Sequence, residues 1–371
     1  MENDKAFKNL INQQVVNLIS KEIKSVYPSF NETAFKKLSK DLIPLELKQR
    51  VLLITQELKI YLPGHYPEAL KVLQKVMQRK NLSGFSLWPF SEYIGQFGLD
   101  HFDESMQGMY LLTQHFTSEF AIRPYLLKDP QRVLKFFSSW TNDKDTHIRR
   151  WLSEGSRPLL PWGAKIPLFV QDPSYTLPIL EKLKFDEELY VRKSIANHLN
   201  DISKNHPDVV IATLAAWEKS SPESHRAKIE WIKRQALRTL IKKGHKNALK
   251  LMGVVGKAKT TMGKLKINQK SFKLNDKLNF EFDIFSTSRN QQKLVIDYQI
   301  HFVKANGGYG TKTFKLKTFD LEAKEKVIIK KTHSLKSITT MKYYPGLHHL
   351  CIQINGEVCA QISWDFNPIL N

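Results

Sequence analysis

The segment from Ser153 to Trp162 combines residue types that packing alone does not require. It reads Ser-Glu-Gly-Ser-Arg-Pro-Leu-Leu-Pro-Trp and follows a helical stretch that carries the adjacent arginines Arg149 and Arg150. One carboxylate, three arginines, two prolines and the indole ring of Trp162 therefore lie within fourteen residues. Basic side chains at this density favour a ligand that carries phosphate groups. The carboxylate in their midst needs an explanation of its own.

A related layout returns 43 residues later. Asp129-Pro130 recurs as Asp172-Pro173, and His147-Ile148-Arg149-Arg150 recurs as Tyr190-Val191-Arg192-Lys193. Trp231-Ile232-Lys233-Arg234 follows after a further 41 residues. A period of about 40 to 47 residues predicts paired helices of the HEAT type. Such units stack into a curved solenoid because no single unit buries its apolar face. Chance similarity between helices is the alternative.

Side chains four residues apart share one face of a helix. Applied to the three copies, this spacing predicts three stripes that stack beside each other into one basic surface. Two carboxylates and an amide are embedded in that surface. The stripes are Arg150 with Glu154, then Lys193, Asn197 and Asp201, and finally Arg234, Arg238 and Lys242.

The two carboxylates, Glu154 and Asp201, would repel phosphate, so we expect them to hold a cation or a water molecule. A positively charged alkylated base and the oxocarbenium-like sugar formed when it leaves are suitable cations. Trp162 is suited to stack on the sugar or the base, because aromatic faces attract cations. The alternative is that Arg150 and Glu154 form a surface ion pair worth about 0.3 kcal/mol, with Trp162 in the core.

Five stretches of the chain share a resemblance with one known family. They are Leu87-Trp88-Pro89 with Glu92-Tyr93, Ser118 to Pro124, Ser153 to Trp162, Val191 to Ile202, and Asp297-Tyr298 with Val303 to Gly307. These stretches resemble the HEAT-like-repeat DNA alkylation-repair glycosylases, specifically the AlkC-type branch, over nearly the whole chain. The resemblance implies excision of cationic N-alkylated bases of the 3-methyladenine type in base excision repair. It implies no metal or other cofactor, and a lesion that need not be fully flipped into a pocket.

The resemblance also implies site residues. Glu119, Glu154 and Asp201 match acids of the family's active site, and Trp162 matches an aromatic residue there. Arg157 resembles a supporting partner of a phosphate or a carboxylate. The roles of the individual acids stay unassigned, and a helical ion pair with Arg123 is the alternative for Glu119.

The basic positions of the repeats are the expected contacts to the DNA backbone. They are Arg149, Arg150, Arg157, Arg192, Lys193, Lys204, Arg234 and Arg238. Trp88 and Glu92 are either a second aromatic–acid pair at the cleft or, for Trp88, part of the core. His198 is expected to be structural.

The chain is expected to be mainly α-helical, with a HEAT-like helical-repeat solenoid followed by a C-terminal immunoglobulin-like β-sandwich. Residues 1–255 would form the solenoid, which binds DNA and carries the catalytic groups. The segment from Gly253 to Lys259 reads as a linker, and residues 259–371 would form the sandwich and act as a DNA clamp. Strands are expected at 277–285, 294–303, 311–319, 326–332, 347–354 and 357–365. A solvated β-face is the alternative for its lysine patches.

The charge balance points to a polyanionic partner. The 371 residues carry a net charge of +21, with 38 Lys and Arg against 27 Asp and Glu up to residue 255 and 19 against 9 thereafter. We therefore expect a polyanion as the partner, and the resemblance implies that this polyanion is double-stranded DNA with alkylated bases. A basic scaffold without catalysis, which binds nucleic acid or an acidic protein, is the alternative from another functional class.

We expect a cytoplasmic protein that acts as a monomer. The two cysteines, Cys351 and Cys359, make neither a disulfide framework nor a zinc signature, and we expect both to be reduced and buried. The alternative is that the two cysteines face each other across a hairpin. The polar start of the chain and the absence of a long apolar run predict neither a signal peptide nor a membrane span.

Overall fold

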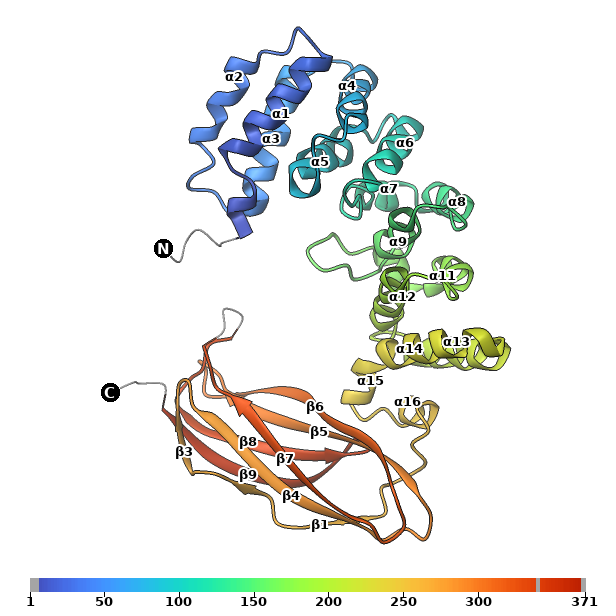
Figure 1. Ribbon diagram of the computed structural model, residues 1–371, viewed down its shortest axis with the longest axis vertical. Coiled ribbons are helices and arrows are strands. Elements are labelled where there is room, and N and C mark those ends of the chain that lie inside the picture. The colour runs from blue at the N-terminus through green and yellow to red at the C-terminus, as the bar shows by residue number, and fades with distance from the viewer. Residues whose placement is uncertain (1–6, 338–340, 368–371) are drawn as a thin grey trace. The chain divides into compact units, whose positions relative to one another are not determined.

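The computed structural model describes residues 7–337 and 341–367 (Figure 1). The chain divides into two compact units. The first comprises the residues up to His206 together with Ser221–Ala236, and the second comprises Pro207–Ser220 together with Leu237–Asn371. Residues 1–6, on which part of the signal-peptide prediction rests, lie outside the described residues.

The described part of the first unit is helical. Its α-helices are α1 (Gln13–Val26), α2 (Glu32–Lys36), α3 (Leu47–Tyr61), α4 (Tyr66–Gln78), α5 (Trp88–Phe97), α6 (Phe102–Thr113), α7 (Arg123–Lys128), α8 (Pro130–Ser139), α9 (Thr146–Gly155), α10 (Pro167–Gln171), α11 (Leu177–Leu183), α12 (Leu189–Ile202) and α14 (Glu223–Ala236). Short 3₁₀ helices lie at η2 (Phe7–Leu10), η3 (Lys37–Lys40), η4 (Gly84–Leu87) and η5 (Pro173–Tyr175).

The repeated Asp-Pro pairs start helices. The side chain of Asp129 accepts a hydrogen bond from the Arg132 amide at 3.0 Å and caps α8, with Pro130 as the first helical residue. Asp172 caps η5 in the same way, through the Ser174 amide at 2.9 Å. The aspartate satisfies an amide that the first turn leaves unpaired, and proline tolerates that position because it has no amide hydrogen.

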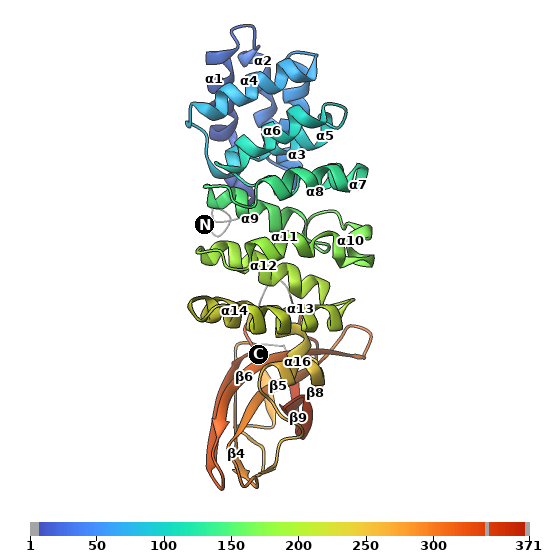
Figure 2. The same ribbon diagram turned by 90° about the vertical axis from the view of Figure 1, so that its right-hand side faces the viewer.

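Helices α9, α12 and α14 lie side by side as successive layers (Figure 2). Equivalent residues of the predicted repeat meet between the first two layers, where the rings of His147 and Tyr190 are 5.7 Å apart. The Asn200 amide donates to the Ala236 carbonyl at 2.7 Å and links α12 to α14. In this part of the chain, helices of successive predicted repeats therefore pack against each other.

The predicted stripe of Arg234, Arg238 and Lys242 is wrong as a feature of one helix. Helix α14 ends at Ala236, and a separate helix, α15 (Arg238–Lys242), begins two residues later. A third helix at this end, α16 (Lys246–Leu251), carries Leu249, which packs with Val254 and Val295 of the second unit. The boundary between the two units, at Ala236 and Leu237, lies before the change in composition near Gly253.

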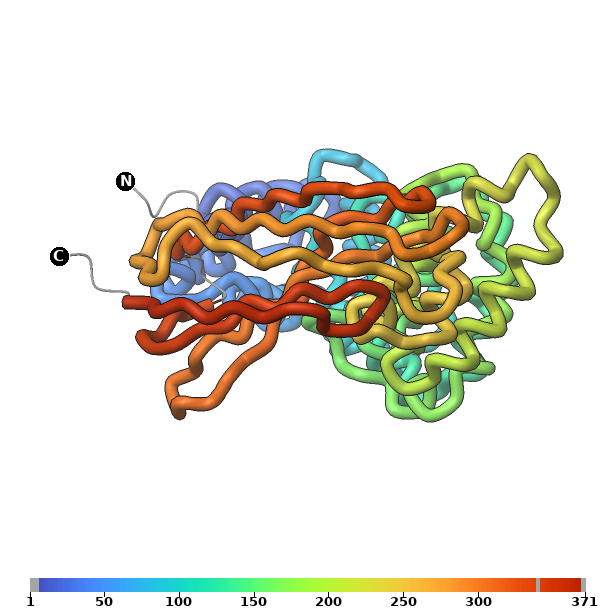
Figure 3. Tube along the Cα trace, turned by 90° about the horizontal axis from the view of Figure 1, so that it is seen from below, coloured from blue at the N-terminus to red at the C-terminus, as the bar shows by residue number. Residues whose placement is uncertain are grey.

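The second unit contains α13 (Pro207–Ser220), α15, α16 and a sandwich of two sheets, whose strands Figure 3 follows as a trace. One sheet pairs β4 (Lys277–Ser286) with β1 (Thr260–Met262), β2 (Lys266–Ile267) and β7 (Lys326–Ser334). The other has the order β3 (Ser271–Lys273), β9 (Glu357–Asn367), β8 (Gly346–Ile354), β5 (Gln292–Val303) and β6 (Tyr309–Leu321). The six predicted strands are confirmed within a few residues at each end, and the short β1, β2 and β3 are additional.

Alternating side chains of the two sheets fill the sandwich core. Leu278, Phe280, Phe282 and Ile284 of β4 are buried, while the residues between them point away from the core. Both cysteines are free, and Cys351 is buried as expected. The expectation that Cys359 is buried is wrong, because its side chain on β9 is exposed. Cys351 pairs in register with Gln361 instead of Cys359. The described helices include none that is both long and apolar enough to cross a bilayer. Residues 7–337 and 341–367 contain no group of three His, Cys, Asp or Glu side chains arranged for a metal.

Candidate active site

A buried arginine anchors the loop between α9 and α10. The Arg123 side chain is inaccessible to solvent, and its Nη1 atom donates to the carbonyls of Gly155 at 2.8 Å and Arg157 at 2.7 Å. Its Nε atom donates to the carbonyl of Ala164 at 2.8 Å. Burial, and after it the charge of Arg157, lowers the pKa of Arg123 to about 10. One side chain thus fixes both ends of this loop, which projects from the helices in Figure 1.

Arg157 joins two of the predicted acids. Its Nη1 atom donates to Oε1 of Glu154 at 2.6 Å, and its Nε atom donates to Oδ2 of Asp201 at 2.8 Å. All three side chains are buried. Burial alone would lower the pKa of Arg157, but the hydrogen bond that it donates to Asp201 and the attraction of Glu154 raise it above its usual value. In this structure Arg157 is therefore a partner of carboxylates.

The remaining oxygens of these two acids are also bonded. Oε2 of Glu154 accepts from the Ser194 hydroxyl at 2.7 Å, and Oδ1 of Asp201 accepts from Lys204 Nζ at 2.9 Å. Ser194 and Asp201 lie on α12, whereas Glu154 lies on α9. Stacking of the two helices therefore brings the acids together and holds each carboxylate in one orientation.

Glu119 extends the cluster from another part of the chain. It lies in the turn between α6 and α7, where it accepts hydrogen bonds from the Thr117 hydroxyl at 2.9 Å and from Arg150. Nη2 of Arg150 is also 3.6 Å from Oε1 of Glu154. The alternative pairing of Glu119 with Arg123 is wrong, because α7 begins at Arg123 and the Arg123 guanidinium binds three carbonyls instead.

The cluster balances three carboxylates with three cations. Glu119, Glu154 and Asp201 face Arg150, Arg157 and Lys204. The side chains of Glu154 and Asp201 are only 8% and 3% exposed, so the surface-pair alternative for Arg150 and Glu154 is wrong. Low exposure strengthens every electrostatic interaction within the cluster.

An aromatic cavity of about 320 Å³ opens beside these charges. Glu119, Glu154 and Arg157 contribute its polar wall, and the loop after α9 contributes Leu160, Pro161 and Trp162. Trp162 is 86% exposed with a φ of +63°, so the alternative that it belongs to the core is wrong. The remaining residues that line the aromatic cavity are Phe85, Trp88, Phe116, Thr117 and Phe120.

Trp88 meets both expectations for it. The indole is 7% exposed and stacks on Phe120 with the ring centroids 5.9 Å apart, and its Nε1 donates to Glu92 at 3.1 Å. The ring is thus packed and at the same time forms part of the cavity wall. The phenylalanines of the cavity were not predicted, since isolated aromatic residues in helices and turns carry no signal of their own.

Two relatives match the whole chain. YhaZ from Bacillus subtilis (strain 168), described as an uncharacterized protein, is 40% identical over 354 residues, which is 95% of this chain and 96% of that protein. The solved structure of the Pseudomonas fluorescens alkylpurine DNA glycosylase AlkC, bound to DNA containing an abasic site analog, is 37% identical with a TM-score of 0.91. That match covers 98% of this chain and 99% of the other. The chain belongs to the AlkC-type family.

The second unit is matched separately. A family model described as the C-terminal Ig-like domain of the uncharacterised protein YhaZ matches residues 261–368. This match confirms the predicted immunoglobulin-like domain and agrees with the two sheets of the AlkC-type chain.

The structure divides the predicted DNA contacts of this AlkC-type chain into bonded and exposed groups. Arg149 forms an ion pair with Asp186 at 2.6 Å, and Arg192 donates to the carbonyls of Asp186 and Glu187. Arg149 thereby joins α9 to the segment before α12, and Arg192 holds that segment to α12 itself. Lys193 and Arg234 are exposed, and Arg238 is half-buried on α15.

His198 is structural, as expected. The ring is inaccessible, with Nδ1 2.9 Å from the Ser153 carbonyl and Nε2 3.1 Å from the Thr176 hydroxyl. Burial lowers the pKa of His198 to about 4. Arg123, Ser194 and Thr117 are polar residues of the site that sequence reasoning missed. Arg123 and Ser194 lie within stretches that resemble the family, whereas Thr117 lies just outside them.

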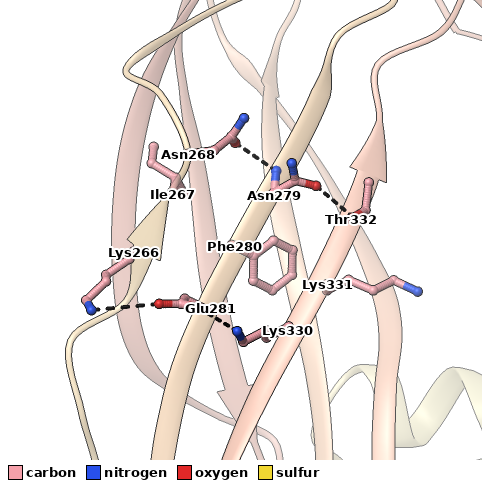
Figure 4. Close-up of a pocket in the computed structure, with 9 residues that line it drawn as sticks. All are labelled: Lys266, Ile267, Asn268, Asn279, Phe280, Glu281, Lys330, Lys331 and Thr332. Carbon is pink, nitrogen blue, oxygen red and sulfur yellow. Dashed lines mark hydrogen bonds and ion pairs between the residues drawn. The ribbon is translucent and has the colours of Figure 1, made fainter.

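A larger groove, of about 630 Å³, lies on the sheet of β2, β4 and β7 in the second unit (Figure 4). Its lysines are partly neutralised, because Lys266 and Lys330 lie 3.7 and 3.4 Å from the carboxylate of Glu281. Asn279 accepts from the Thr332 hydroxyl at 2.7 Å. The groove therefore lacks the combination of buried acids and aromatic rings found in the first unit.

Proposed function

We propose that this chain is a DNA glycosylase that removes cationic N-alkylated bases, of the 3-methyladenine type, in base excision repair. The observation that carries the proposal is the aromatic cavity whose polar wall contains Glu119, Glu154 and Arg157. The relationship to an alkylpurine DNA glycosylase across nearly the whole chain supports the same activity.

The cavity suits a cation that forms and disappears during the reaction. Cleavage of the N-glycosidic bond of a cationic nucleotide releases a neutral base and leaves positive charge on the sugar. Carboxylates fixed beside the sugar stabilise that charge, and water adds to the sugar with loss of one proton. The base leaves without prior protonation, so a strong general acid is not required.

The bonded state of the acids favours this electrostatic role. Arg157 holds Glu154 and Asp201 in fixed orientations, so neither carboxylate needs to reorganise when charge develops on the sugar. Asp201 is not in the wall of the aromatic cavity, and Glu154 is. We therefore assign direct contact with the sugar or its attacking water to Glu154, and support of that carboxylate through Arg157 to Asp201.

The aromatic rings suit recognition of a positively charged base. Trp162, exposed at the rim, and Trp88, packed in the wall, present π-faces toward which a cation is attracted. A neutral base such as uracil gains no comparable attraction. The proposed function requires no cofactor.

The proposed partner is double-stranded DNA, bound by a monomer. Lys193 and Arg234 are exposed basic side chains of α12 and α14, and Lys204 follows α12 with a partly exposed side chain. In the second unit, Lys312, Lys315 and Lys317 are exposed lysines of β6, which we propose as the clamp. Each phosphate neutralised releases counterions, so affinity should fall steeply with salt.

Release of free base tests the proposal. The wild-type protein should liberate 3-methyladenine from methylated duplex DNA, and the Glu154→Gln variant should not. Uracil should stay in a uracil-containing duplex under the same conditions. Failure of the folded wild type to release any methylated base would leave the non-catalytic scaffold as the function, and equal release of uracil would refute the electrostatic mechanism.

A further inference from the structure

A second cavity, of about 330 Å³, adjoins the aromatic cavity. The two cavities share Phe116, Thr117 and Glu119 as a common wall. The rest of the second lining is mostly polar and comes from three separate elements: Thr113 and His115 at the end of α6, His147 and Arg150 on α9, and Tyr190 on α12. The mechanism proposed above uses neither imidazole and leaves Tyr190 without a role.

The polar groups of this second cavity are mainly hydrogen-bond donors. The rings of His147 and Tyr190 meet edge to face at 5.7 Å, and the Arg150 guanidinium carbon lies 5.3 Å from the Tyr190 ring centroid. Tyr190 is 42% exposed, and His147 is also exposed, so both can reach a ligand. Glu119 is the carboxylate of this wall, and it already accepts from Arg150 and Thr117.

We propose that this second cavity binds a phosphodiester of the lesion strand, next to the damaged nucleotide. Imidazole, phenol and guanidinium groups are suitable donors to phosphate oxygens. Successive nucleotides of one strand rise by about 3.4 Å, so a sugar in the aromatic cavity keeps a flanking phosphate close to the shared wall. The inference rests on the proposed function, because it assumes that the lesion nucleotide occupies the aromatic cavity.

A phosphate held here would position the sugar without contacting the base. His147 and Arg150 are on the helix that carries Glu154, and Tyr190 is on the helix that carries Asp201. The backbone would therefore be fixed by the same two helices that fix the acids. Tyr190 and His147 act as positioning residues in this arrangement, and their effect should depend on the charge of one particular phosphate.

Binding of chemically altered duplexes tests the inference. Three duplexes would carry a stable abasic-site analogue: one unmodified, and two with a neutral methylphosphonate on the 5′ or the 3′ side of that site. Dissociation constants would be measured by fluorescence anisotropy for the wild type and for the Tyr190→Phe and His147→Gln variants. Tyr190→Phe keeps the ring that packs against His147 and Arg150, so its fold should be preserved.

Each variant should bind the unmodified duplex about tenfold more weakly, as expected for loss of a hydrogen bond to a charged group. One of the two methylphosphonate duplexes lacks the charge of the contacted phosphate. On that duplex the dissociation constants of wild type and variants should agree within about twofold. Equal losses on all three duplexes, or no loss on any, would overturn the inference. His65→Gln is the matched control, because His65 is an exposed histidine at the start of α4; it should bind each duplex like the wild type.

Base release by the wild type separates this inference from the proposed function. If the wild type releases 3-methyladenine but the variants show no weakened binding that disappears on one methylphosphonate duplex, the phosphate site alone is overturned. If the variants show that pattern of binding but the wild type releases no base, the glycosylase activity is overturned and the phosphate site is supported.

Discussion

The buried guanidinium of Arg123 donates a hydrogen bond to the main-chain carbonyl of Arg157 at 2.7 Å. Two positive charges are thereby placed near each other in a buried region, and the pKa of Arg123 is lowered to about 10 by burial and by Arg157. The contact is nevertheless useful, because it holds the backbone of the residue that links Glu154 to Asp201. The position of the acids thus depends on a residue that contacts neither of them.

Replacement of Arg123 by lysine should uncouple the loop from the acids. An ammonium group cannot match the fork of the guanidinium toward three carbonyls, so at least one buried acceptor loses its partner. We expect a loss of about 2 kcal/mol in the free energy of unfolding and single-turnover base release slowed about a hundredfold. Urea denaturation and rapid-quench assays measure the two effects.

Arg50→Lys is the matched control for this variant. Arg50 is also buried and donates to the carbonyls of Lys8, Ile11, Ile43 and Leu45, but it lies on α3. It should lose similar stability and retain its rate of base release. Unchanged release by Arg123→Lys, or an equal slowing by Arg50→Lys, would show that Arg123 does not position the acids.

Trp162 should matter for excision and hardly at all for folding. Its side chain is 86% exposed and its backbone has a φ of +63°, a conformation that glycine adopts without strain. Trp162→Gly should therefore keep the free energy of unfolding within about 0.5 kcal/mol of the wild type, while base release falls at least about tenfold. Trp162→Phe should restore most of the rate. A glycine variant that excises normally would remove Trp162 from the site.

Asp201→Asn should abolish base release while DNA affinity stays equal or increases. The substitution removes a negative charge that repels phosphate. The neutral amide no longer offsets the charge of Arg157, so Glu154 is left to neutralise that arginine instead of the sugar cation. Single-turnover excision and anisotropy titrations measure the two quantities. Asp129→Asn is the charge-matched control, because asparagine also caps a helix such as α8, and this variant should excise normally. Base release by the Asp201→Asn variant at the wild-type rate would show that Asp201 is not part of the active site.

The exposed lysines of β6, Lys312, Lys315 and Lys317, should contribute to the salt dependence of binding. Replacement of all three by glutamine should flatten the slope of log K against log salt by about 2 to 3, because up to three fewer counterions are released. Lys326 and Lys330 provide the control pair, since they lie 2.9 and 3.4 Å from Asp283 and Glu281. Their replacement should change the slope less. Equal slopes for both sets would contradict the clamp.

His198 should make stability depend on pH. Burial lowers the pKa of His198 in the folded protein to about 4, against 6.5 in the unfolded chain. The unfolded state thus binds a proton first as the pH falls. Stability should decrease from about pH 6.5 down to about pH 4, by up to about 3 kcal/mol from this group. Urea titrations of the wild type and His198→Gln would show the difference, and identical pH profiles would contradict it.

The sequence by itself determined the element types and the repeat. The 43-residue offset pairs residues that lie next to each other on neighbouring helices. His147 and Tyr190, which differ by this offset, are in ring contact. The strands from β4 to β9 followed from alternation of apolar and polar residues, a local property of a half-buried strand. Glu154 and Asp201 were found through spacing and through family resemblance.

Only the tertiary structure decided which charges meet. Spacing along a helix suggested Glu119 with Arg123, but a turn separates them, and Arg150 from another helix takes the carboxylate. The Arg157 side chain reaches Asp201 across 44 residues, a distance at which sequence carries no directional information. Burial decides such pairings, since the most favourable set of partners depends on every charge that the packed helices enclose. The exposure of Trp162 likewise follows from how Arg123 ties down its loop.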